Sequence, residues 1–78
     1  MKLSSGAKKL FIDYAEDSAN WGGTPLVGGN VDSSEKNNGY LTKLKKEGLI
    51  ETFQDEGAAW ILFTKKGVAY AESLGIPV

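Results

Sequence analysis

The first regular pattern in the chain is a set of apolar residues separated by one, three and four positions. It comprises Ala7, Leu10, Phe11, Tyr14 and Ala15. These spacings place its members on one face of a helix, which we predict over residues 5–19 with a serine of the Ser4-Ser5 pair as N-cap. Three carboxylates lie near its C-terminal end, where the helix dipole disfavours negative charge: Asp13, Glu16 and Asp17. The pattern does not explain that placement.

The residues that follow form a glycine-rich connection. Gly22, Gly23, Gly28 and Gly29 surround the segment Thr24-Pro25-Leu26-Val27. A threonine followed by proline is typical of a helix start, but the flanking glycines limit such a helix to about one turn. We therefore predict a shortened helix inside a tight connection that carries four apolar side chains into the core: Trp21, Leu26, Val27 and Val31.

A second strong helical pattern follows this connection. Asp32 with Glu35 approximates a capping box, and Gly48 marks the end, so we predict a helix over residues 33–47. Its buried face carries Tyr40, Leu41 and Leu44, and its opposite face carries Glu35, Asn38, Gly39, Thr42, Lys43 and Lys46. A glycine inside a helix costs about 1 kcal/mol relative to alanine. Gly39 therefore either allows another surface to approach closely or marks a weak helix.

After the second helix the period changes from helical to alternating. Residues 49–54 and 59–64 read as two strands joined by the turn Asp55-Glu56-Gly57-Ala58. Pairing across that turn sets Phe53 opposite Trp60 on one face. The other face carries Ile50, Ile61 and Phe63. Neither face is polar, so the ribbon is either covered on both sides or presents an apolar patch to a partner.

The last helical pattern is short. We predict a helix over residues 65–74, capped by Thr64 and ended by Gly75. Its inner face carries Val68, Ala71 and Leu74. The predicted order is therefore helix, short connection, helix, two-stranded ribbon and helix, which is an α+β arrangement.

The composition removes most kinds of chemistry. The 78-residue chain has no cysteine and no histidine, so it lacks disulfides, thiolate metal ligands and the commonest general base. We therefore expect no enzyme activity, no cofactor and no bound metal. The length suits one domain, residues 1–78. Because no segment has the apolar length of a signal peptide or a membrane span, we expect a cytoplasmic protein with no membrane partner.

Charge is distributed unevenly along the chain. The basic residues are all lysines, 9 of them, and with 10 acidic residues they leave a net charge of −1. Residues 33–50 hold four lysines against two glutamates, whereas residues 51–63 hold three acidic residues and no lysine. Positive charge is therefore concentrated on the predicted helix 33–47. Lysines there favour phosphate contacts, although lysines taken singly on a surface helix serve equally well to keep a protein soluble.

Two segments resemble parts of winged helix-turn-helix proteins. Residues 41–51, LTKLKKEGLIE, resemble the end of the recognition helix and the first wing strand of that family. Residues 61–67, ILFTKKG, are similar to the second wing strand and the following cap of MarR-like and PadR-like regulators. The resemblance spans about residues 32–74. It implies a single winged-helix domain with three helices and a two- or three-stranded wing sheet, here with a shortened second helix.

The resemblance also implies a function. Such proteins bind double-stranded DNA and regulate transcription, often as homodimers, so we expect a DNA partner and a homodimer formed through the first and last helices. Helix 33–47 is expected to enter the major groove by its N-terminal half, with Lys43 and Lys46 holding the DNA backbone. The full set of expected DNA contacts is Ser33, Ser34, Lys36, Asn37, Asn38, Thr42, Lys43, Lys46, Lys65 and Lys66.

Three features favour an alternative, a protein-interaction module on the same frame. The wing tip is the acidic pair Asp55-Glu56, the net charge is close to zero, and the outer face of the ribbon is aromatic and apolar. Its binding surface would be the apolar outer face of ribbon 49–64, formed by Phe53, Trp60 and Leu62. That face could equally be covered by Trp21 and the glycine-rich connection.

Overall fold

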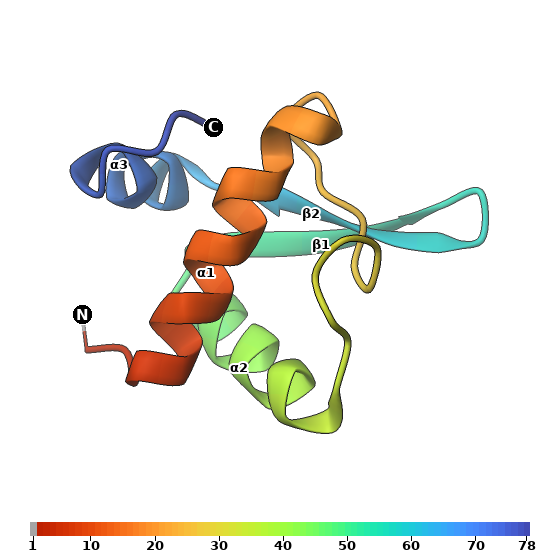
Figure 1. Ribbon diagram of the computed structural model, residues 1–78, viewed down its shortest axis with the longest axis horizontal. Coiled ribbons are helices and arrows are strands. Elements are labelled where there is room, and N and C mark those ends of the chain that lie inside the picture. Colours follow the sequence, from red (N-terminus) through yellow and green to blue (C-terminus); the bar gives the residue numbers. More distant parts are fainter. Residues whose placement is uncertain (1) are drawn as a thin grey trace.

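The computed structural model describes residues 2–78 and has the α+β class that the sequence predicts (Figure 1). Its elements are α1 (Ser5–Asp17), the 3-10 turn η1 (Ser18–Asn20), α2 (Glu35–Lys46), β1 (Ile50–Asp55), β2 (Ala58–Phe63) and α3 (Lys65–Ser73). Three α-helices and a two-stranded antiparallel sheet are consistent with a small winged-helix-like fold. Within residues 2–78, no helix has the length and apolar character needed to cross a bilayer.

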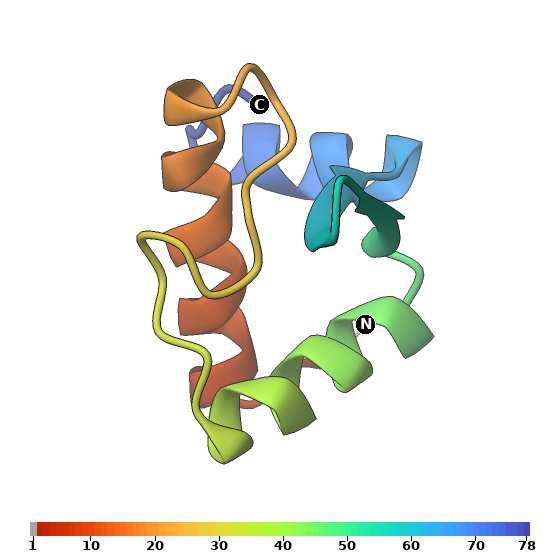
Figure 2. The ribbon, with the colours of Figure 1, turned by 90° about the vertical axis from the view of Figure 1, so that its right-hand side faces the viewer.

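The core is built around α1. Figure 2 shows α2 and α3 crossing α1 near its two ends, with the hairpin of β1 and β2 between them. The predicted apolar face of α1 is buried throughout, and the Phe11 ring contacts Phe63 of β2 and Tyr70 of α3, with ring centroids 5.7 and 4.9 Å apart. At the α2 end, Gly6 allows the two helices to approach, because a Cβ there would overlap the Tyr40 ring.

The hairpin has the predicted register. Phe53 lies opposite Trp60, and Ile50 and Ile61 are buried on the inner face. The turn is shorter than predicted, because pairing continues as far as Asp55 and Ala58. Only Glu56-Gly57 connects the strands, and both residues have positive φ, 52° and 76°. That conformation is typical of a type I′ turn, whose twist matches that of the paired strands.

The prediction of a short helix at Thr24-Pro25 is wrong. The segment is extended and lies along the outer edge of β2, where Leu26 forms an isolated bridge with Trp60 (Figure 1). The Ile61 amide donates to the Pro25 carbonyl and the Val27 amide donates to the Ala59 carbonyl, both at 2.9 Å. Pairing with β2 satisfies these backbone groups, whereas a helix interrupted by glycines would gain few hydrogen bonds.

Helix α2 begins two residues later than predicted. Ser34, not Asp32, is its N-cap, and its Oγ accepts a hydrogen bond from the Asn37 amide at 3.1 Å. Asp32 contributes its backbone carbonyl instead, which accepts from the Asn37 side chain at 2.9 Å. Asp32 and Ser34 are both of residue types that cap helices. Ser34 is the cap because it directly precedes the helix in an extended conformation.

Candidate nucleic-acid interface

Helix α2 presents one long side to solvent. Leu41 and Leu44 hold its other side in the core, and Tyr40 is half-buried against α1. The middle of the exposed side carries Glu35, Gly39, Thr42 and Lys46. Lys36 and Lys43, seven positions apart, flank that line on one side, while Asn38 and Lys45 flank it on the other. All of these residues are exposed, so α2 offers a continuous polar surface with lysines along its length.

The N-terminal polar residues of α2 are partly occupied by local hydrogen bonds. Ser34 caps the helix and the Asn37 side chain is bound to the Asp32 carbonyl. Ser33 Oγ donates to Asn38 Oδ1 at 3.4 Å, and both residues are exposed. Ser34 and Asn37 therefore organise the start of the helix. Asn38 retains its amide NH₂, since only its Oδ1 is engaged with Ser33.

The C-terminal end of α2 is joined to the start of α3 through Glu47. Lys43 forms an ion pair with the Glu47 carboxylate at 3.1 Å, and Lys66 Nζ donates to the Glu47 carbonyl at 2.7 Å. The hydrogen bond and the charge of Lys43 lower the pKa of Glu47. Lys43 and Lys66 are consequently brought to one place, with Lys65 exposed beside them in the first turn of α3. Within residues 2–78 neither Lys36 nor Lys46 has an ion-pair partner.

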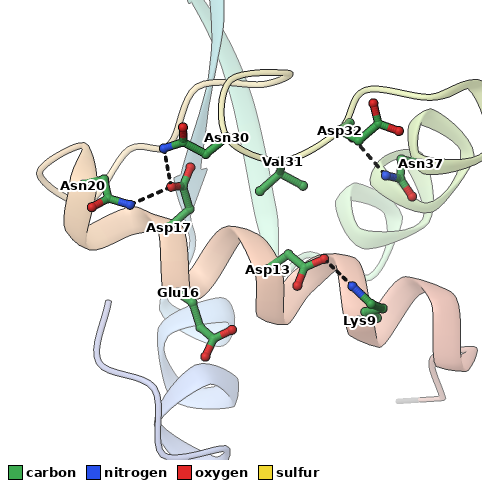
Figure 3. A pocket seen from close by; sticks show the side chains of 9 residues that line it. All are labelled: Lys9, Asp13, Glu16, Asp17, Asn20, Asn30, Val31, Asp32 and Asn37. Atoms are coloured by element: carbon green, nitrogen blue, oxygen red, sulfur yellow. Dashed lines mark hydrogen bonds and ion pairs between the residues drawn. The ribbon is translucent and has the colours of Figure 1, made fainter.

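Groups of negatively charged side chains lie outside α2, at the wing tip and beside α1. The wing tip carries Asp55 and Glu56, both exposed. A hollow of about 520 Å³ near the C-terminal end of α1 is lined by Lys9, Asp13, Glu16, Asp17, Asn20, Asn30, Val31, Asp32 and Asn37 (Figure 3). Lys9 is paired with Asp13 at 2.9 Å. In residues 2–78 no group of three or more acidic side chains is arranged to hold a metal ion.

Asp17 is the centre of a hydrogen-bond network that the sequence patterns did not reveal. Its carboxylate is buried and accepts three hydrogen bonds, from Asn20 Nδ2 at 2.9 Å, Trp21 Nε1 at 2.9 Å and Asn30 Nδ2 at 2.8 Å (Figure 3). Burial raises the pKa of this carboxyl, but the three donors outweigh burial, and the pKa is lowered overall. The only signal in the sequence was the disfavoured position of an acid at a helix C-terminus. The network explains why Asp17 stands at this disfavoured position, because its carboxylate fixes the connection against α1.

The outer face of the ribbon is only partly covered. Trp60 is half-buried, and the Trp21 ring meets it edge-on with centroids 5.6 Å apart. Phe53 and Leu62 keep 40% and 45% of their surface exposed. Trp21 therefore covers one part of this apolar face, and Phe53 with Leu62 remains open to solvent.

In the structure, the residues predicted to contact DNA lie along α2, at the two positions before it and in the first turn of α3. They are Ser33, Ser34, Lys36, Asn37, Asn38, Thr42, Lys43, Lys46, Lys65 and Lys66. The Thr42 hydroxyl donates back to the Asn38 carbonyl at 3.1 Å and keeps its acceptor capacity. Comparisons with family models, curated proteins and solved structures find no match to this chain.

Proposed function

We propose that the protein binds double-stranded DNA through α2 and acts as a regulator of transcription. The observation that carries this proposal is the exposed side of α2, which has lysines along its length and ends where Glu47 gathers Lys43 and Lys66. An α-helix fits the major groove of B-DNA. Lysines spaced along its flanks then face the phosphates on either side of the groove.

The exposed residues of α2 would have two roles: the lysines would provide affinity, and Asn38 would read the DNA sequence. Lys36, Lys43 and Lys46 would neutralise phosphates, which releases counterions and provides binding energy without reading the sequence. Asn38 is the best-placed side chain for a base contact, since it is exposed near the helix start and asparagine pairs with adenine. Because the chain has no arginine, we propose a salt-sensitive contact of modest specificity.

The proposal is tested by measuring affinity for duplex DNA at several salt concentrations. In the double variant Lys43→Ala/Lys46→Ala, the slope of log affinity against log salt should become shallower by about 1.8, since each phosphate contact contributes about 0.9. Lys2→Ala/Lys8→Ala is the matched control, because it removes two exposed lysines outside α2. Equal slopes for the two double variants would contradict a DNA contact through α2.

A second candidate function is protein binding through the outer face of the ribbon. The observation that favours it is the exposure of Phe53 and Leu62 beside the half-buried Trp60. Large apolar side chains grouped on a surface are typical of interaction sites. If the amide chemical shifts of residues 51–63 change when the protein concentration is raised, self-association through this face is supported. The Phe53→Ser variant should then show no such concentration dependence.

We further propose a homodimer, which the resemblance to winged-helix regulators supports. Its two copies would present two α2 helices to two DNA half-sites. Sedimentation equilibrium over a range of protein concentrations distinguishes a dimer from a monomer. A mass of one chain both free and bound to DNA would contradict this proposal.

A further inference from the structure

The two edges of the hairpin differ. Segment 24–27 covers the outer edge of β2, where Ala59 and Ile61 exchange hydrogen bonds with Val27 and Pro25. Among residues 2–78 no backbone hydrogen bond covers the corresponding edge of β1 at Thr52 or Gln54. In Figure 1 the tip of the hairpin, where β1 joins β2, extends beyond the helices.

The register decides which backbone groups point to the open edge. Ala59 and Ile61 direct their backbone groups to segment 24–27. The backbone groups of the other residues of β2, at positions 58, 60 and 62, therefore bond to β1. Those residues pair with Glu51, Phe53 and Asp55. The amides and carbonyls of Thr52 and Gln54 therefore point outward. Unpaired groups of this kind are a template for another strand.

The side chains beside this edge specify a partner chemistry. Phe53 is 40% exposed on the outer face, and exposed carboxylates lie two positions before and after it, at Glu51 and Asp55. A strand added at the edge would set its own residues opposite these three in non-hydrogen-bonded pairs, in which side chains are close. The complementary sequence therefore has an apolar residue with a basic residue two positions away on each side.

We propose that the open edge of β1 binds an extended basic-apolar segment of a partner protein by strand addition. This inference rests on the second candidate function, in which the outer face of the ribbon binds protein. Main-chain hydrogen bonds to Thr52 and Gln54 hold the segment, Phe53 packs on its apolar residue, and Glu51 and Asp55 pair with its basic residues. Residues 51–63 contain no lysine that would repel such a segment.

The test uses a synthetic nine-residue peptide with lysine at positions three and seven, leucine at position five and threonine elsewhere. Binding to the full chain is followed by amide chemical shifts. We expect shifts at Thr52 and Gln54, and a loss of affinity of about tenfold or more when both lysines are replaced by glutamate. Glu51→Lys/Asp55→Lys in the protein should restore binding of the glutamate peptide, because both residues are exposed and outside the core.

N-methylation of the peptide separates strand addition from simple contact with the apolar face. N-methyl groups at positions four and six remove the N–H donors that face Thr52 and Gln54, so binding should be lost, whereas an N-methyl group at position five should be tolerated. Binding that survives both modifications, with shifts at Phe53 and Leu62 only, would overturn strand addition and leave the ribbon face as an interaction surface. No binding of the unmodified peptide at millimolar concentration would also overturn it.

Discussion

Asp17 shows how one buried carboxylate positions a whole connection. It lies at the last position of α1 and accepts hydrogen bonds from Asn20, Trp21 and Asn30. A carboxylate at a helix C-terminus opposes the helix dipole. Three donors nevertheless lower the pKa of Asp17 and keep it ionised. Asp17 therefore ties both ends of the glycine-rich connection, Trp21 and Asn30, to α1 by charge-assisted hydrogen bonds.

Replacing Asp17 should make stability less dependent on pH. Asp17→Asn should lower the free energy of unfolding by about 2 kcal/mol at neutral pH, since it removes a charged acceptor. The carboxylate has a lowered folded-state pKa. Its stabilisation is therefore complete above the unfolded-state pKa of about 3.9 and is lost as pH falls through the folded-state pKa.

Urea unfolding at neutral and acidic pH measures this effect. The difference between wild type and Asp17→Asn should narrow as pH falls below about 4. Glu16→Gln is the matched control, because Glu16 is the exposed neighbour, and its effect should stay within about 0.5 kcal/mol. A constant difference at all pH values would show that the charge of Asp17 does not matter.

Gly39 lies in the middle of the exposed side of α2, and a Cβ there would meet nothing within 4 Å. Gly39→Ala should therefore raise the free energy of unfolding by about 1 kcal/mol. Gly67→Ala is the contrasting variant, because its Cβ would overlap the Leu49 carbonyl oxygen, and it should destabilise by about 1–3 kcal/mol. Thermal unfolding measures both changes.

The Gly39→Ala variant also separates the two interpretations of Gly39. If the exposed side of α2 lies against DNA, Gly39→Ala will bind more weakly although its fold is more stable, because the added methyl group obstructs close approach. If Gly39 only weakens the helix, DNA affinity will be unchanged or higher. Affinities of the two proteins for one duplex at one salt concentration decide between these outcomes.

At the scale of elements, the N-terminus of α2 depends on Ser34. Ser34→Ala should lower the free energy of unfolding by about 1 kcal/mol, since the Asn37 amide loses its partner. Asp32→Ala should cost less than about 0.5 kcal/mol, because only the Asp32 backbone carbonyl is used. Urea unfolding of both variants gives the comparison, and an equal or larger loss for Asp32→Ala would mean that Asp32 is the cap.

The hairpin and the helices were predictable because their signals are local. Alternation of apolar residues set Phe53 opposite Trp60, and the period of three and four identified the buried face of α1. The extended segment 24–27 was not predictable in this way. Its hydrogen bonds go to Ala59 and Ile61, more than thirty residues away in the chain, and no local pattern carries that information.

At the scale of the molecule, most of the lysines and most of the carboxylates lie in different regions. Lysines follow α2 and the start of α3, whereas carboxylates gather at the wing tip and in the hollow beside α1. The lysine surface was predictable, because it lies on the face of one helix. The acidic hollow was not, because Asp13 and Asp17 come from α1 while Asn30 and Asp32 come from the connection. Only the folded chain brings them together.

The charge separation suggests how DNA would be approached. The lysine surface of α2 would attract the phosphates, and the hollow, which reaches the N-terminal end of α2 at Asp32 and Asn37, would repel them at that end, so the molecule would orient before contact. This orientation depends on salt, because exposed charges are screened beyond about 10 Å at moderate ionic strength.

DNA binding by α2 is tested by titrating the labelled protein with duplex DNA at low salt and following the amide chemical shift of every residue. We predict shifts along the exposed side of α2, from Asn38 to Lys46, and at Lys65 and Lys66, which diminish as salt is raised. No shift in α2, or shifts confined to Phe53, Trp60 and Leu62, would contradict DNA binding by α2.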